Sequence, residues 1–199
     1  GKEDIFKHMG DKDKFFSTVV VLEVDQKPPQ EIIDKVVTDC DISEKNLTVI
    51  LTPTRSLCGT TQVVGRVLEV GLHKVHELGF PIDKVVDGFG SAPLPPPAPD
   101  FLIGMGRTND AILYGGLVHL YVDTPNDDAE ELAKRLPSST SKDYGKPFAD
   151  IFKEYKYDFY QIDKMLFSPA KVIVSSLKTG KSYTSGNIDL SLMDNSFNK

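Results

Sequence analysis

The segment from Thr60 to Leu78 restricts the fold more than any other part of the sequence. It has the pattern of one long helix, which Gly79 and Pro81 would end. On a wheel of about 100° per residue its apolar side chains cover a wide arc, which only Lys74 interrupts. Such a helix is largely buried, so the chain must supply several elements to cover it. The arc contains Val63, Val64, Val67, Leu68, Val70, Leu72, Val75 and Leu78.

The remaining side of this helix carries a narrow polar stripe. Its members lie within about 40° of one direction, at spacings of four, three and four residues: Gln62, Arg66, Glu69 and His73. An Arg–Glu pair on a solvent-facing stripe is common and contributes little to stability, and the wheel alone favours this interpretation. In the alternative, the stripe faces a cavity, where a carboxylate held by a guanidinium could position and deprotonate water.

Strand and helix patterns alternate along the chain, which predicts an α/β fold, with α+β as the alternative. Strands are expected at Ser17–Asp25, Leu47–Thr52, Lys84–Val86 and Leu117–Val122, the first two mostly buried. Further helices are expected at Pro28–Asp39, Thr108–Tyr114, Asp127–Arg135, Phe148–Tyr155 and near Asp189–Phe197. A hairpin is expected from Lys171–Ser176 and Lys181–Thr184. Loops are expected at Asp87–Asp100, which is rich in glycine and proline, and at Pro137–Pro147.

Composition narrows the class of protein. The net charge of −6 argues against nucleic acid as the main partner, because phosphate binding needs a basic surface. No apolar run approaches the roughly 20 residues of a membrane span. The opening residues lack the apolar core of a signal peptide, and the two cysteines need no disulfide framework, so we expect a cytoplasmic protein. Residues 1–16 are expected to be an irregular N-terminal segment, and residues 17–199 to form the folded part.

Several apparent motifs lack their usual context. The Gly88-Phe89-Gly90 sequence has Pro93 where a dinucleotide loop has its third glycine. The Gly180-Lys181-Ser182 sequence lies in an expected hairpin rather than between a strand and a helix. Two minority alternatives stay open: a metal on His73 and His76, and a thiolate at Cys58 that would need a distant histidine such as His119.

Five stretches together resemble the C-terminal two-thirds of methenyltetrahydromethanopterin cyclohydrolases: PTRSLCGTTQVVGRVLEVGLHKVHELGF, DGFGSAPLPP, IGMGRTNDAILYGG, LPSSTSKDYGKPFADIFK and YDFYQIDKMLFSPA. The resemblance implies a two-lobed α/β fold with the substrate pocket between the lobes. It further implies a cytoplasmic homotrimer that needs no metal or redox cofactor. The N-terminal lobe is expected to be largely missing from this chain, and with it one wall of the pocket. Lys164 and Arg55 replace the residues usual in the family.

The resemblance implies a hydrolase of one-carbon metabolism, in methanogenesis or methylotrophy. Its substrate would be a tetrahydromethanopterin-type carrier, whose 5,10-methenyl form becomes the 5-formyl form. The family's essential Arg-x-x-Glu falls on Arg66 and Glu69, which makes the cavity-facing interpretation of the stripe the preferred one. Glu69 is then the expected base and Arg66 its partner.

Other residues are candidates for binding the pterin. Gln62 could orient the water or the ring, and glycines at 88 and 90 would let backbone approach a flat ring closely. Amide, carboxylate and aromatic side chains could bind the edge and faces of the ring. For each of these residues the alternative is a role in loop geometry or packing. The full set is Gln62, Gly88, Gly90, Asn109, Asp110, Tyr144, Phe159 and Tyr160.

Two competing functions remain. A noncatalytic fragment or oligomerisation module derived from the enzyme would suit a chain without the N-terminal lobe, although the intact Arg66–Glu69 pair disfavours it. A folate cyclohydrolase is disfavoured because the lysine-based signatures expected of that enzyme are missing.

Overall fold

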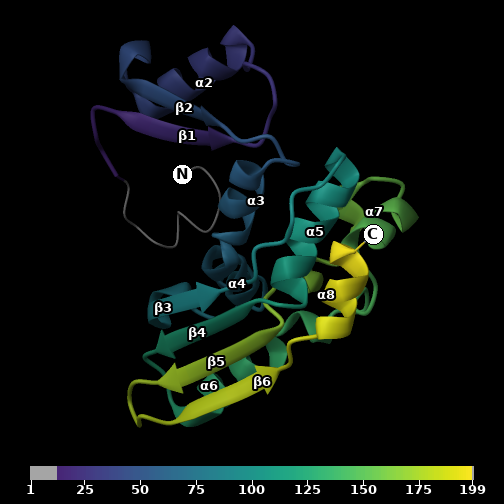
Figure 1. Cartoon of the computed structure of the whole chain (residues 1–199). Coiled ribbons are helices and arrows are strands. Elements are labelled where there is room, and N and C mark those ends of the chain that lie inside the picture. The colour runs from purple at the N-terminus through teal and green to yellow at the C-terminus, as the bar shows by residue number, and fades with distance from the viewer. Residues whose placement is uncertain (1–12, 199) are drawn as a thin grey trace.

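The computed structural model describes residues 13–198, which form a small β–α–β unit followed by a larger mixed sheet with helices around it (Figure 1). This arrangement confirms the expected α/β fold. Residues 1–12 of the expected N-terminal segment lie outside the described part, and residues 13–17 contain no helix or strand. No helix within residues 13–198 is both long and apolar enough to cross a membrane.

The small unit consists of β1 (Thr18–Leu22), α2 (Gln30–Cys40), the 3₁₀ turn η1 (Glu44–Asn46) and β2 (Leu47–Leu51). The two strands are parallel, and α2 lies across one side of them (Figure 1). The prediction of mostly buried strands is wrong for the opposite side, where Val19, Val21 and Ile50 are exposed. Register and strand alternation place these three side chains on one face, which no described element covers.

The expected long helix is two helices, α3 (Leu57–Val64) and α4 (Val67–Glu77), so the prediction of one continuous helix is wrong. Arg66 leaves the helical conformation with ψ 15°, and its N–H donates to Val63 O three residues back. Gly65 stands at the break, where its weak helix propensity favours an interruption. The start of α3 is also earlier than expected because Ser56 Oγ accepts from Gly59 N at 3.0 Å, which caps the helix.

The larger sheet has the order β3 (Val85–Ser91), β4 (Leu117–Val122), β5 (Lys171–Ser176) and β6 (Ser182–Gly186). Its central pair is parallel and both outer pairs are antiparallel, which confirms the expected hairpin. α4 and α6 (Asn126–Arg135) contribute to one apolar core with the sheet. This core includes Val67, Val75, Val118, Leu120, Val122, Leu132, Val172 and Val174.

A second core lies beside the sheet, among α5 (Phe101–Leu113), α7 (Phe148–Glu154) and α8 (Leu190–Phe197) (Figure 1). α5 is longer than expected because Asp100 caps it, accepting from Ile103 N at 3.0 Å. Short 3₁₀ turns connect the elements: η2 (Ile82–Lys84), η3 (Ser138–Thr140), η4 (Phe159–Gln161) and η5 (Lys164–Leu166).

The strand β3 begins one residue later than expected and runs on to Ser91, into the segment that was expected to be a loop. A side chain at Gly90 would place its Cβ 2.9 Å from Val67 Cγ1, and one at Gly88 would lie 3.1 Å from Leu68 Cδ1. Because both neighbours belong to α4, the two glycines allow this helix to pack closely on the strand.

We predict that Gly90→Val lowers the free energy of unfolding by about 1–3 kcal/mol, because the added methyls overpack the contact with Val67. Urea unfolding followed by circular dichroism would measure the change. The matched control is Ser91→Val, since Ser91 is exposed on the same strand and should change stability by about 0.5 kcal/mol or less. Equal effects of the two substitutions would show that the close helix–strand contact does not limit stability.

Candidate active site

Arg66 and Glu69 lie together where α4 begins. Arg66 immediately precedes the helix, and Glu69 is in its first turn, where a carboxylate interacts favourably with the helix dipole. Arg66 Nε is 3.8 Å from Glu69 Oε2, and the side chains are 56% and 66% exposed. A pair this open contributes little to folding stability. The arrangement therefore leaves the Glu69 carboxylate accessible to solvent or a ligand.

The break between the helices separates Gln62 from this pair but leaves His73 on the same helix as Glu69. Gln62 belongs to α3, so the single wheel used to align it with Glu69 does not apply. His73 is one turn beyond Glu69, and its Nε2 lies 3.8 Å from Glu77 Oε1. Within residues 13–198 no cluster of three or more His, Cys, Asp or Glu side chains could hold a metal ion.

Gly88 and Gly90 were predicted to lie in an open loop whose backbone could approach a flat ring. In the structure both belong to the strand β3. Their Cα positions face Leu68 and Val67 of α4, and on the same side Leu120 and Val118 of β4. This packing gives the two glycines a structural explanation that does not involve a ligand.

Asn109 and Asp110 occupy neighbouring positions on α5 but have different surroundings. Asp110 is fully buried, and its carboxylate accepts from Phe148 N at 2.8 Å and from Ser196 Oγ at 2.6 Å. This contradicts the prediction that Asp110 offers its carboxylate to a pterin, because those oxygens face the core. Asn109 is half-buried, and its Nδ2 donates to Met105 O at 2.9 Å.

The three predicted aromatic residues belong to the second core and its surface. Tyr144 packs edge-on against the buried Tyr114, with 5.2 Å between ring centroids, and burial raises the pKa of Tyr144. Phe159 stacks on Phe167 at 4.8 Å and is 42% exposed, whereas Tyr160 is 93% exposed. Tyr160 and the open side of Phe159 are therefore accessible for stacking on a ligand.

Lys74 is a buried charge whose role the sequence did not reveal, although it interrupted the apolar arc. Its side chain is 0% exposed, and Nζ donates to Pro137 O at 2.7 Å, Thr140 Oγ1 at 2.8 Å and Met165 O at 2.7 Å. Burial lowers the pKa of Lys74 to about 8, with Asp163 acting in the opposite direction and Arg135 in the same one. A lysine within an apolar stripe was the available signal.

A second polar network connects the loops that Lys74 contacts. Ser141 Oγ donates to Asp163 Oδ2 at 2.7 Å, and Asp163 N donates to Asp143 Oδ2 at 2.9 Å. Tyr155 Oη lies 3.0 Å from both oxygens of Asp143. Burial alone would raise the pKa of Asp163, but hydrogen bonds from Ser141 and Met165 N outweigh it and hold that pKa below its ordinary value.

The candidate residues thus form two groups on adjacent elements. Arg66 and Glu69 lie at the start of α4, while the aromatic residues lie around α5 and α7. The turn between α5 and β4 reaches the start of α4, where a Cβ at Gly116 would lie 3.1 Å from Val67 Cγ2. A hollow of about 380 Å³ lies on the β3 side of α4, next to Leu68 and Leu72, and Arg66 and Glu69 do not line it.

Comparison with known proteins decides the family. Residues 1–197 match the family model described as Cyclohydrolase (MCH). The chain belongs to this cyclohydrolase family. Among curated members, the methenyltetrahydromethanopterin cyclohydrolase of Methylobacillus flagellatus is 59% identical over 99% of the chain. The protein of the same name from Xanthobacter autotrophicus is 51% identical over 98% of the chain. That from Methylophilus methylotrophus is 61% identical over 77% of the chain and 87% of its own length.

The chain spans 60% of the length of the Methylobacillus cyclohydrolase and 58% of the Xanthobacter one. These longer cyclohydrolases therefore contain residues with no counterpart in this chain. The match nevertheless includes all the elements that carry the candidate site, from α3 to η4.

We predict that Asp110 is structural in this cyclohydrolase segment. Asp110→Asn should lower the free energy of unfolding by about 1.5–3 kcal/mol, the scale for hydrogen bonds to a charged group. Denaturant titration would measure it. The neighbouring Asn109→Ala removes one half-buried hydrogen bond and should cost about 1 kcal/mol or less. If Asp110→Asn were as stable as the parent, the carboxylate would not hold α5 to α7 and α8.

Proposed function

We propose that this chain is part of an enzyme that hydrolyses 5,10-methenyltetrahydromethanopterin to 5-formyltetrahydromethanopterin. The observation that carries the proposal is the family match over residues 1–197. It is supported by relatives whose names state this activity. The exposed Arg66–Glu69 pair at the start of α4 gives a place where a carboxylate could meet the substrate.

The chemistry requires a positioned base rather than a Lewis acid. The methenyl carbon bridges N5 and N10 in an amidinium-like cation, so it is already electrophilic. The oxygen of the attacking water bonds to the methenyl carbon while Glu69 takes one proton from it. When the C–N10 bond breaks, Glu69 returns that proton to N10, and the remaining hydroxyl proton is released to solvent as the formyl C=O forms, so a cationic substrate gives a neutral product and one proton. Its negative charge attracts the cationic substrate, while Arg66 holds the carboxylate in place. The proposal therefore needs no metal or redox cofactor.

Residues around the pair would hold the substrate. Gln62 precedes the break and could orient the water or the ring from α3. Tyr160 and Phe159 present aromatic surface to a flat ring, and Tyr144 and Asn109 lie within the same group of elements. We assign the glycines 88 and 90 to packing instead.

A cytoplasmic homotrimer is part of the same proposal, with a tetrahydromethanopterin-type carrier as the ligand. A second candidate is that the chain is noncatalytic by itself and acts only within a larger protein. The exposure of both Arg66 and Glu69 favours this second candidate, since a base that works on one bound water needs other water excluded.

We predict that this chain alone hydrolyses methenyltetrahydromethanopterin much more slowly than a protein with the length of the Methylobacillus relative. An exposed pair neither excludes water nor holds the substrate in place. Loss of the methenyl absorbance, measured for both proteins at equal concentration, would compare them. Equal rates would rule out the second candidate.

We predict that Glu69→Gln lowers kcat by about 10²–10⁴ in a complete enzyme containing this segment, the usual scale for a positioned general base. Circular dichroism should be unchanged, because the side chain is exposed and its ion pair is long. Near-normal activity of a folded Glu69→Gln variant would remove Glu69 from the mechanism.

Two further variants act as controls on that measurement. Arg66→Ala should also lower kcat, and the double variant should lose much less than the sum, since the two residues act as a unit. His73→Ala is the matched control, because His73 is on the same helix one turn beyond the pair. A large effect of His73→Ala would place the reaction further along α4.

A further inference from the structure

Lys74 joins three segments that are far apart in the sequence. It lies on the buried side of α4, while its hydrogen-bond acceptors are in two loops that follow α6 and α7. One loop begins at Pro137 and includes η3, and the other includes η4 and η5. A single side chain thus fastens both loops to the helix that carries Glu69.

The acceptors match the donors of an ammonium group in number. A charged lysine has three N–H bonds, and Nζ has three acceptors within 2.8 Å. An apolar side chain of the same length would leave the buried carbonyl oxygen of Pro137 and the half-buried one of Met165 without this donor, which is costly. Two charged side chains act on Nζ across this contact, Asp163 attractively and Arg135 repulsively.

The two loops are also bound to each other next to Lys74. Ser141 directly follows η3 and hydrogen-bonds Asp163, which precedes η5 by one residue. Tyr144 is three residues beyond Ser141, and Phe159 lies four residues before Asp163. Fixing Nζ therefore restricts the loops that carry two of the proposed ring-binding side chains.

We infer that Lys74 is a positioning residue, whose ammonium group sets the place of the two ring-binding loops relative to the Glu69 helix. This role rests on the proposed function, since it assigns substrate binding to the loops. Lys74 does not touch the substrate and acts through the loops that it holds. The three hydrogen bonds to Pro137, Thr140 and Met165 constitute what we call the Lys74 clamp.

The clamp can be tested in the chain itself by amide hydrogen exchange. Lys74→Met keeps the length of the side chain and removes all donors, so residues 138–141 and 164–167 should exchange at least about tenfold faster. Lys164→Met is the matched control, because Lys164 also links η5 to α4, through Glu77 at 3.6 Å, but is exposed. Equal exchange in the two variants would overturn the clamp, whatever the activity of the protein.

The acceptor side gives a second test that does not risk the fold, because Thr140 is exposed. Thr140→Val removes the hydroxyl at nearly constant shape, and Thr140→Ser retains it. In a complete, active enzyme, Thr140→Val should raise KM about threefold to tenfold with kcat within about twofold, and Thr140→Ser should restore KM. Identical KM values for both variants would overturn the positioning role. An inactive parent enzyme would instead count against the proposed function, and the exchange measurement would still decide the clamp.

Discussion

Helix α4 can lie flat on the strand β3 because two positions of that strand have no side chain. At Gly88 and Gly90 a Cβ would come within 3.1 Å of Leu68 or Val67, so a larger residue would force these side chains of α4 to shift. The first turn of α4 is thereby fixed beside the end of β3. The position of the Arg66–Glu69 pair depends on this contact, although neither residue takes part in it.

Two turns further along the same buried side, α4 is held by a different kind of interaction. There the contact is polar, since the Lys74 ammonium group replaces the apolar side chain that the surrounding pattern would suggest. Apolar burial tolerates small slips along a surface, whereas three hydrogen bonds from one nitrogen fix both distance and direction. Helix α4 is thus held by apolar packing in its first turn and by directional hydrogen bonds two turns later.

Local patterns in the sequence were sufficient wherever an element is defined by its own residues. Leu117–Val122 was predicted to the residue, because alternation and β-branching act within the strand itself. The i, i+3 spacing likewise placed Glu69 next to Arg66 despite the helix break. The break between α3 and α4 was not predicted, because a single glycine within a strongly periodic apolar segment does not indicate that the helix is interrupted.

Predictions were wrong or incomplete where the packing of segments distant in the sequence decides how a residue is bonded or buried. In the sequence Asp110 cannot be distinguished from an exposed polar residue near a helix end. Only the packing of α7 and α8 shows that its carboxylate oxygens accept hydrogen bonds inside the protein. Gly88 and Gly90 were predicted to lie in a loop, but they belong to β3 because β4 pairs with this segment. Lys74 was noticed as an exception, but its three acceptors are at least 63 residues away.

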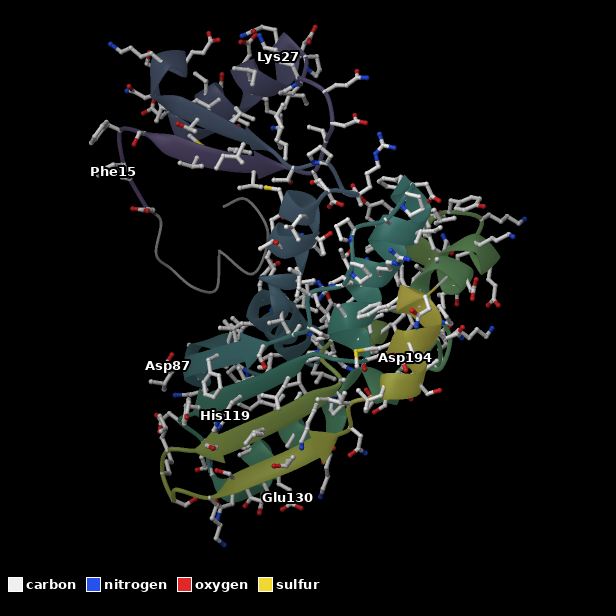
Figure 2. The ribbon with its side chains drawn as sticks, in the orientation of Figure 1. Phe15, Lys27, Asp87, His119, Glu130 and Asp194 are labelled. Atoms are coloured by element: carbon white, nitrogen blue, oxygen red, sulfur yellow. The ribbon has the colours of Figure 1, made fainter. Side chains whose placement is uncertain are left out.

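The uncovered face of the small unit affects how the chain loses its structure. Phe15 stands at the surface beside β1, and Val19 and Val21 are open to solvent on the face away from α2 (Figure 2). Among the residues of α2 only Ile33 is buried, so the small unit has little apolar core of its own. The four-stranded sheet has two apolar cores around it, so we expect it to unfold at a higher denaturant concentration than the small unit. A free energy of unfolding measured for a change at Gly90 or Asp110 therefore refers to the sheet and its cores, and opening of the small unit would be a separate, earlier transition.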